Sequence, residues 1–378
     1  MIIIIGTGLA GYQLAREFRR IDPAGPLMLL TADDGKFYPK PQLSTAQTSK
    51  KTADNLVTGT AESMATQLNA EIKTHHSVTA IDTKNKTVTA NNTVFPYEKL
   101  VLACGADVLK APIEGDAASD IFSINHIYHY AEFENLIKNK KQIAILGAGL
   151  IGCEFTNDLC NVGYSVDIIA PDKSLLERFL PAEIGAILQK ELEKMGARFH
   201  LNCTAQKIEK NNQNYTLFLS NGKTITTEFV LSAIGLKPHV ALAKTANLQI
   251  NRGILVNRYL ETSEKNIYAL GDCAEVEGHV LPFITPILNC AKALAKTLGG
   301  EPTAVEYPAM PITVKTPAHP LVICPPPSHI KGEWKISPEN NGFRALFQDA
   351  NQKLYGFVLT NDAVKERFNL AKQIPALF

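Results

Sequence analysis

Two glycine-rich segments of the chain have the residue types and the spacing that bind the pyrophosphate of a dinucleotide. Both follow the pattern G-x-G-x-x-G, and each stands between a short apolar run and a helix-like stretch. In such a turn the first glycine allows a tight bend, the second lets backbone N–H groups approach the phosphates, and the third lets helix and strand pack closely. The N-terminus of the helix adds partial positive charge. The first segment is Gly6, Thr7, Gly8, Leu9, Ala10 and Gly11, and the glycines of the second are Gly147, Gly149 and Gly152.

One pattern of this kind is weak evidence, because glycines also serve ordinary turns. Two copies in the required strand–turn–helix context indicate two dinucleotide-binding units in one chain. The first unit is predicted to have strands at 2–5 and 27–30 around a helix at 12–20. The second is predicted to have strands at 142–146 and 166–169 around a helix at 153–161, which Gly163 ends.

The acidic residue that binds a ribose usually ends the second strand of such a unit, and it is missing from both units here. Asp33 or Asp34 in the first unit and Asp172 in the second lie close enough to reach ribose hydroxyls, but they could equally be turn residues. No arginine cluster accompanies Asp172, so NADH is favoured over NADPH, with only Lys173 arguing otherwise. The residues at the expected positions are Thr31 and Ala32 in the first unit and Ala170 and Pro171 in the second.

Composition narrows the class of protein. A chain of 378 residues with 45% hydrophobic and 20% charged residues can build two or three domains with real cores. Its formal net charge of +1 gives no general reason to expect nucleic acid as a partner. The apolar run at 2–5 is too short for a signal peptide or a membrane span. Seven cysteines without Cys-x-x-Cys and nine scattered histidines predict no metal site and favour a reduced, cytoplasmic protein.

A later segment makes the prediction more specific. Residues 262–272 match the pattern T-x-x-x-x-I-Y-A-x-G-D. With the two glycine segments, this pattern resembles the flavoprotein reductases that have two dinucleotide-binding domains, and the resemblance covers 1–300 almost continuously. It implies FAD in the first unit, with the carboxylate of Asp272, next to Gly271, accepting a hydrogen bond from a ribityl hydroxyl. Taken alone, the segment could be a strand and turn with a capping aspartate.

The same resemblance gives two charged residues a catalytic interpretation. Lys40 lies where the family places a lysine beside N5 of the flavin, and Glu154 corresponds to the glutamate that pairs with it. We therefore predict a buried Lys40–Glu154 pair that holds the nicotinamide face open and tunes flavin reduction, although a lysine in a proline-rich loop is usually solvated. Lys315 is a further candidate for contact with the flavin. The other predicted FAD contacts are Val78 and Ile284.

A helix is predicted at 285–298, with Thr285 as its N-cap and Pro286 in its first position. In related reductases the start of this helix faces the pyrimidine ring of the flavin, where negative charge collects on reduction. Its dipole would then stabilise reduced FAD. The segment is equally compatible with an ordinary amphipathic helix.

Missing cysteines and the C-terminal sequence narrow the subclass. The disulfide reductases of this superfamily carry two cysteines four residues apart after the first unit, where this chain has K-P-Q-L-S at 40–44, so electrons must leave directly from FAD. The stretch M-P-I-T-V-K-T-P-A at 310–318, together with the glycine segments, resembles the bacterial rubredoxin–NAD(+) reductases. The resemblance implies that NADH reduces FAD and that FAD passes single electrons to the iron of rubredoxin, a small acidic carrier.

The expected fold is α/β, with two Rossmann-like dinucleotide-binding domains and a small α+β C-terminal domain. Turn-rich crossings place the FAD-binding domain at 1–112 and 235–308, the NAD-binding domain at 113–234 and the C-terminal domain at 309–378, which ends in a helix at 362–372. This last domain is too short for the family's usual dimerisation domain, so a monomer is expected. Two alternatives stay open: a reductase of another one-electron carrier such as ferredoxin, and a non-catalytic flavin redox sensor.

Overall fold

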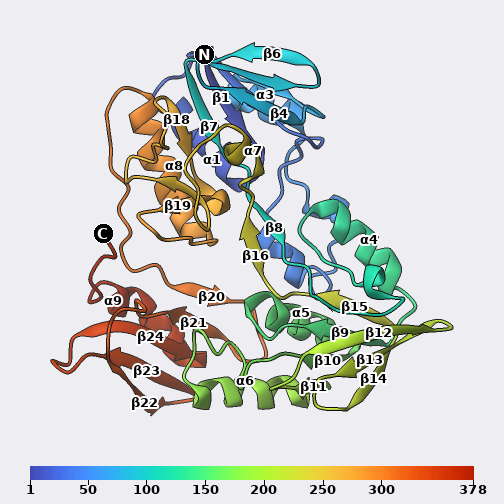
Figure 1. Ribbon diagram of the computed structural model, residues 1–378. Helices are drawn as coiled ribbons and strands as arrows, with labels where there is room; N and C mark the ends of the chain where they lie inside the picture. The colour runs from blue at the N-terminus through green and yellow to red at the C-terminus, as the bar shows by residue number, and fades with distance from the viewer.

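The computed structural model describes all residues of the chain, 1–378. Three main sheets form the framework of the fold. Two of the sheets are parallel and the third is antiparallel. Figure 1 shows the first parallel sheet at the top, the second at the lower right and the antiparallel sheet at the lower left. We call the parts around these sheets the first unit, the second unit and the tail (residues 309–378).

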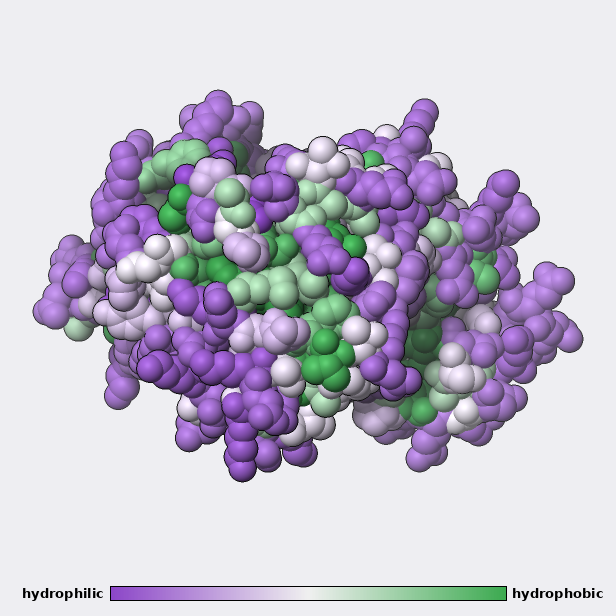
Figure 2. Space-filling model, turned by 90° about the horizontal axis from the view of Figure 1, so that it is seen from above, coloured by the Kyte–Doolittle hydropathy of each residue, from purple (hydrophilic) through white to green (hydrophobic).

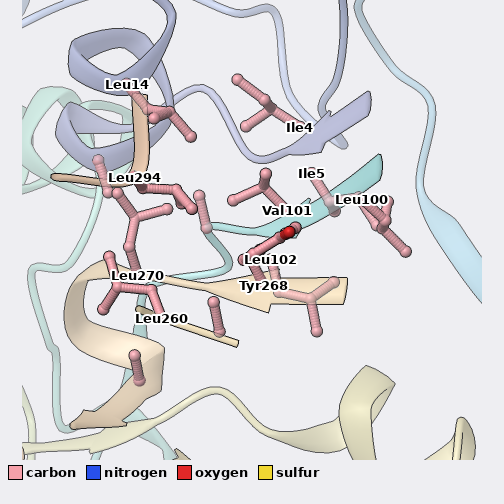
Figure 3. Close-up of a cluster of buried hydrophobic side chains, with 14 of the residues drawn as sticks. Ile4, Ile5, Leu14, Leu100, Val101, Leu102, Leu260, Tyr268, Leu270 and Leu294 are labelled. Atoms are coloured by element: carbon pink, nitrogen blue, oxygen red, sulfur yellow. The ribbon is translucent and has the colours of Figure 1, made fainter. Parts of the chain in front are cut away.

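The first unit is built on a parallel sheet in the order β18-β7-β1-β2-β3. Its strands β1 and β2 are buried on both faces, which explains why they are uninterrupted apolar runs. Leu14 and Leu294, from the helices α1 and α8, belong to the same buried cluster as Ile4, Val101 and Leu102 (Figure 3). The elements are β1 (Ile2–Ile5), β2 (Leu27–Leu30), β3 (Glu71–Lys73), β7 (Lys99–Leu102), β18 (Ile267–Ala269), α1 (Leu9–Arg19) and α8 (Ile284–Leu298).

The second unit repeats this arrangement with a parallel sheet in the order β11-β10-β9-β15. The helix that follows its glycine turn, α5, is buried along most of its length. A three-stranded antiparallel sheet of β12, β13 and β14 extends the unit. The elements are β9 (Gln142–Leu146), β10 (Ser165–Ile169), β11 (Ala197–His200), β12 (Ala205–Asn211), β13 (Asn214–Leu219), β14 (Thr224–Thr227), β15 (Phe229–Ser232), α4 (Ile127–Ile137), α5 (Leu150–Asn161) and α6 (Ala182–Lys194).

The chain passes between the two units twice, and the two passages lie side by side. On the way out it forms β8 (Ala106–Val108), and on the way back it forms β16 (Leu236–Pro238). The two strands pair in antiparallel fashion, with Leu236 opposite Val108. The second unit is therefore inserted into the first, as the turn-rich stretches predicted.

The tail is a five-stranded antiparallel sheet in the order β20-β21-β24-β23-β22. The helix predicted at 362–372 is wrong in detail, because a 3-10 turn, η4 (Asn361–Glu366), precedes a short α-helix, α9 (Arg367–Ala371). Only Ala363 and Leu370 of the two are buried, so no continuous apolar stripe supports one longer helix. The strands are β20 (Ile312–Val314), β21 (Leu321–Cys324), β22 (Glu333–Glu339), β23 (Gly342–Gln348) and β24 (Leu354–Thr360).

None of the helices combines the length and apolar character that crossing a membrane requires. Seen from above (Figure 2), polar side chains form most of the outer rim, and apolar residues gather toward the middle of the face.

Smaller helices and strands complete the first unit. The smaller elements are α2 (Ala53–Leu56), α3 (Ala61–Leu68), α7 (Ala241–Thr245), β4 (Val78–Asp82), β5 (Thr87–Ala90), β6 (Thr93–Pro96), β17 (Ile254–Val256), β19 (Ala274–Val276) and the 3-10 turns η1 (Lys40–Thr45) and η3 (Gly271–Cys273). The 3-10 turn η2 (Ala118–Asp120) belongs to the second unit.

The predicted fold class, an α/β fold with two Rossmann-like units and a small α+β tail, is confirmed. The strands agree with the predicted ranges to within one residue. Both helices after the glycine turns begin three residues earlier than predicted, at Leu9 and Leu150, because the third glycine already lies in the first helical turn.

Candidate functional site

The two glycine turns have nearly the same geometry. Gly6 and Gly147 open the turns with φ of +114° and +105°, a region that favours glycine. A Cβ atom at Gly11 would lie 2.0 Å from the carbonyl oxygen of Gly6, and one at Gly152 would lie 2.1 Å from that of Gly147. No larger residue fits at these positions. The first and third glycines of each segment therefore have the roles that the sequence predicted.

The middle glycine of each turn faces open space. A Cβ atom at Gly8 or at Gly149 would meet no protein atom within 4 Å. Each of these glycines is also the N-cap of its helix, and no side chain caps either helix. Each turn thus leaves unpaired backbone N–H groups beside an open position, which suits the pyrophosphate of a dinucleotide.

Asp33, predicted as a ribose contact or a turn residue, has a turn role. Its Oδ1 accepts hydrogen bonds from the hydroxyl of Thr31 (2.6 Å) and from the backbone N–H of Gly35 (2.9 Å), and its Oδ2 accepts one from Nε2 of His126 (2.9 Å). Burial alone would raise the pKa of Asp33, but these hydrogen bonds hold it well below its ordinary value. Thr7 donates to Thr31 (2.9 Å), so the glycine turn joins this network. A ribose contact by Asp33 stays a prediction.

Asp172 lies beside the second glycine turn. Its half-buried carboxylate makes no hydrogen bond within the protein. Burial raises the pKa of the Cys153 thiol, and the charges of Glu154 and Asp172 raise it further, which places Asp172 near the first turn of α5. Its carboxylate is free to accept a hydrogen bond from a ribose hydroxyl.

Asp272 and Lys40 share a half-buried region beside the first glycine turn. A Cβ at Gly271 would lie 2.8 Å from the Cβ of Ala10, so η3 brings Asp272 directly beside α1. Oδ1 of Asp272 is buried and has no hydrogen-bond partner. Burial raises the pKa of Asp272 and lowers that of Lys40, and the opposite charge of the other residue offsets each shift in part. An unpaired acceptor next to a buried cation fits the hydroxyl-rich linker and pyrophosphate of FAD.

The predicted pair between Lys40 and Glu154 is wrong. Nζ of Lys40 instead donates to Oδ1 of Asn125 at 2.6 Å. The ion-pair partner of Glu154 is Lys315 of the tail, whose Nζ contacts Glu154 Oε2 and whose backbone N–H donates to Oε1 at 3.1 Å. The hydroxyl of Ser44 completes the cluster, because it donates to Glu154 Oε2 at 2.6 Å and accepts from Lys315 Nζ at 3.0 Å.

The polar face of α5 explains why Glu154 pairs with Lys315 of the tail and not with Lys40. Asn157 Oδ1 accepts from the backbone N–H of Ala318 at 3.0 Å, which holds the segment after β20 against the helix. Asp158 accepts from the backbone N–H groups of Gln47 (3.1 Å) and Thr48 (2.8 Å), which holds the segment after η1. The tail therefore reaches Glu154 from one side of α5 and the first unit from the other. Buried polar residues at i, i+3 and i+4 of an apolar helix were the sequence signal for this contact.

The N-cap of α8 lies two residues before its predicted position. The helix begins at Ile284 with Phe283 as its N-cap, so Thr285 lies inside the first turn and caps nothing. No acidic residue occupies the first turn, which leaves the positive end of the helix dipole without a charged partner. Ile284 is 45% exposed, whereas Val78 is half-buried and packs against the core of the first unit.

The raised pKa of Asp272 gives a testable pH dependence in the FAD-free protein. The folded protein keeps a proton on Asp272 at pH values at which the unfolded chain has lost it. The free energy of unfolding should therefore fall as the pH rises from the ordinary carboxylate pKa through the raised one. Asp272→Asn should lack this decrease. Urea unfolding of both FAD-free proteins from about pH 4 to about pH 7 measures the difference, and parallel curves would contradict the prediction.

Comparison with known proteins agrees with this geometry. The family model "Pyridine nucleotide-disulphide oxidoreductase" matches residues 1–327, and the model "Rubredoxin binding C-terminal domain" matches residues 304–374. The chain is similar to the rubredoxin-NAD(+) reductase of Alcanivorax borkumensis, with 45% identity over 100% of this chain and 99% of the relative. It is 46% identical to the rubredoxin-NAD(+) reductase of Acinetobacter baylyi, over 100% of this chain and 98% of the relative. Among solved structures, a ferredoxin reductase from Rhodopseudomonas palustris shares the fold with a TM-score of 0.90 and 24% identity, covering 99% of this chain and 95% of that one.

Proposed function

The chain belongs to the pyridine nucleotide-disulphide oxidoreductase family, and from this we propose that it transfers electrons from NADH through FAD to rubredoxin. A rubredoxin-binding domain at 304–374 supports rubredoxin as the acceptor. The single observation that carries the proposal is the contact of Lys315 with Glu154, because it brings a residue of the rubredoxin-binding tail to the N-terminal half of the NADH-binding helix.

When bound, FAD accepts two electrons as hydride and returns them one at a time. The residues of the chain have separate tasks in holding the two dinucleotides. The turn around Gly8, together with Lys40 and Asp272, would hold FAD in the first unit. The turn around Gly149 and the free carboxylate of Asp172 hold NADH in the second.

The cluster of Lys315, Glu154 and Ser44 joins α5, the helix after the second glycine turn, to η1 of the first unit and to the tail. Its cation is held in place by two oxygens, Glu154 Oε2 and Ser44 Oγ, so it needs no reorganisation when negative charge develops beside it. The uncapped start of α8 adds a second, weaker positive potential. Each feature would favour the reduced state of a flavin bound beside it.

We further propose that the protein acts as a monomer in the cytoplasm. Val314, Leu321 and Ile323 of the tail pack into the core of the second unit, so this apolar face is already covered within one chain. All seven cysteines are free thiols, as expected in a reducing compartment.

An anaerobic titration tests the function. Stoichiometric NADH should bleach the yellow protein, and added rubredoxin should restore its colour while the rubredoxin is reduced. NADPH should react at least about tenfold less efficiently, which corresponds to about 1.4 kcal/mol. Reoxidation by a [2Fe–2S] ferredoxin but not by rubredoxin would favour the other carrier. A protein that stays yellow with NADH would be a flavin sensor and would refute the proposal.

A further inference from the structure

Four consecutive residues of the second unit contact the first unit. These residues, 125–128, lie between the crossing strand β8 and the body of α4, and we call them the clasp. The clasp is anchored on the second unit, since Tyr130 and Phe133 of α4 are fully buried in its core. It can therefore move away from the first unit only if α4 moves with it or its own backbone rearranges.

One end of the clasp contacts the loop after β2, next to the position predicted for the ribose. Nε2 of His126 donates to Oδ2 of Asp33 at 2.9 Å. The ring of His126 is fixed by stacking on Tyr128, with centroids 5.0 Å apart and planes 11° apart, and by the edge of Tyr38 at 5.8 Å. Nδ1 of His126 is buried and has no partner, so the contact with Asp33 is its only hydrogen bond.

The other end contacts the region proposed to hold the ribityl chain. Oδ1 of Asn125 accepts from Nζ of Lys40 at 2.6 Å, while its Nδ2 donates to the backbone oxygen of Ala106 at 2.8 Å. Lys40 makes no ion pair, so Asn125 is the group that fixes the position of its half-buried ammonium group. Between the two ends, the backbone N–H of Ile127 donates to the hydroxyl of Tyr38 at 3.1 Å.

Two neighbouring residues of one unit thus hold two residues of the other unit that flank the FAD site at different points. Asp33 belongs to the network of the glycine turn, and Lys40 shares a buried region with Asp272. A dinucleotide lying along these residues is covered from the side of the second unit.

We propose that the clasp closes the FAD site from the second unit, with Asn125 and His126 as positioning residues that hold Lys40 and Asp33 against the dinucleotide and slow its release. The inference rests on the FAD placement given under Proposed function.

The rate of FAD release tests the clasp without depending on turnover. Free FAD fluoresces strongly, so dilution of the FAD-loaded protein into buffer reports its dissociation. Asn125→Ala and His126→Phe should each release FAD about tenfold faster, because each removes a hydrogen bond to a charged group. His126→Gln, whose amide can still donate to Asp33, should behave nearly as the natural protein. His329→Phe, the same substitution at an exposed histidine of the tail, is the matched control.

The double variant and Asp272→Ala separate the possible outcomes. If the two contacts act as one clasp, the double variant should release FAD faster than either single variant but by less than the product of their effects. Weaker FAD binding in Asp272→Ala with natural release rates in both clasp variants would overturn the clasp and leave the FAD placement standing. Natural release rates in all three variants would overturn both.

Discussion

Replacing Lys315 by methionine should slow the reduction of bound FAD by NADH on the order of 100-fold, the usual cost of removing one preorganised charged or hydrogen-bonding group from a reacting centre. Methionine keeps the length of the side chain but removes the cation that Glu154 Oε2 and Ser44 Oγ hold in place. Stopped-flow absorbance of the flavin after mixing with NADH measures the rate. The FAD content should stay the same, because the binding turn and Asp272 are untouched.

The same substitution also leaves the buried carboxylate of Glu154 without a cation, which should cost stability on the order of 3 kcal/mol. A double variant, Lys315→Met with Glu154→Gln, separates the two effects. Removing both charges should restore much of the lost stability, since Ser44 can still donate to the amide oxygen, but it should not restore the rate. Recovery of the rate in the double variant would show that Lys315 acts only by neutralising Glu154.

Alanine at the middle glycine of each turn should separate the two binding functions. Gly149→Ala should raise the apparent dissociation constant for NADH at least about tenfold and leave FAD bound, whereas Gly8→Ala should yield protein largely free of FAD. Both glycines have ordinary φ values, −70° and −78°, and face open space, so alanine causes no strain in the protein itself. The losses should therefore come from contact with the ligand alone.

Two measurements check this pair of variants. The ratio of flavin to protein absorbance gives the FAD content, and the dependence of the reduction rate on NADH concentration gives the apparent dissociation constant. Each variant controls for the other. Loss of FAD from Gly149→Ala, or full FAD content in Gly8→Ala, would reverse the assignment of the two turns.

The sequence predicted the binding turns well because their geometry is local. Whether a Cβ clashes at Gly11 depends on Gly6, five residues away, and both lie within one printed motif. The partner of Glu154 depends instead on where the tail returns, 161 residues later, and no local pattern contains that information. Lys40 lies where the family resemblance implies a partner for Glu154, but its ammonium group donates to Asn125 instead. Ion pairs between side chains of different units depend on tertiary structure. The polar face of α5 was the one sequence feature that indicated a contact between this helix and another part of the chain.

The start of α8 shows a different limit. Thr285 and Pro286 have the residue types of an N-cap and a first helical position, yet the helix begins at Ile284. Helix ends are decided by small differences in free energy, and here the N-cap is Phe283, two residues before Thr285, while Pro286 and Ile287 are buried inside the helix.

The paired crossing strands β8 and β16 have a mechanical consequence. Because both connections run through one ribbon, the chain crosses between the units at a single place, while Leu43, Ala46, Ala53 and Leu56 of the first unit also pack in the core of the second. The tail is joined to the second unit by a shared apolar core and by α5. Any rocking about the ribbon would therefore carry the tail, the second unit and the segment at 43–56 together, so that the NADH-binding turn and the rubredoxin-binding surface would swing in the same direction relative to the first glycine turn.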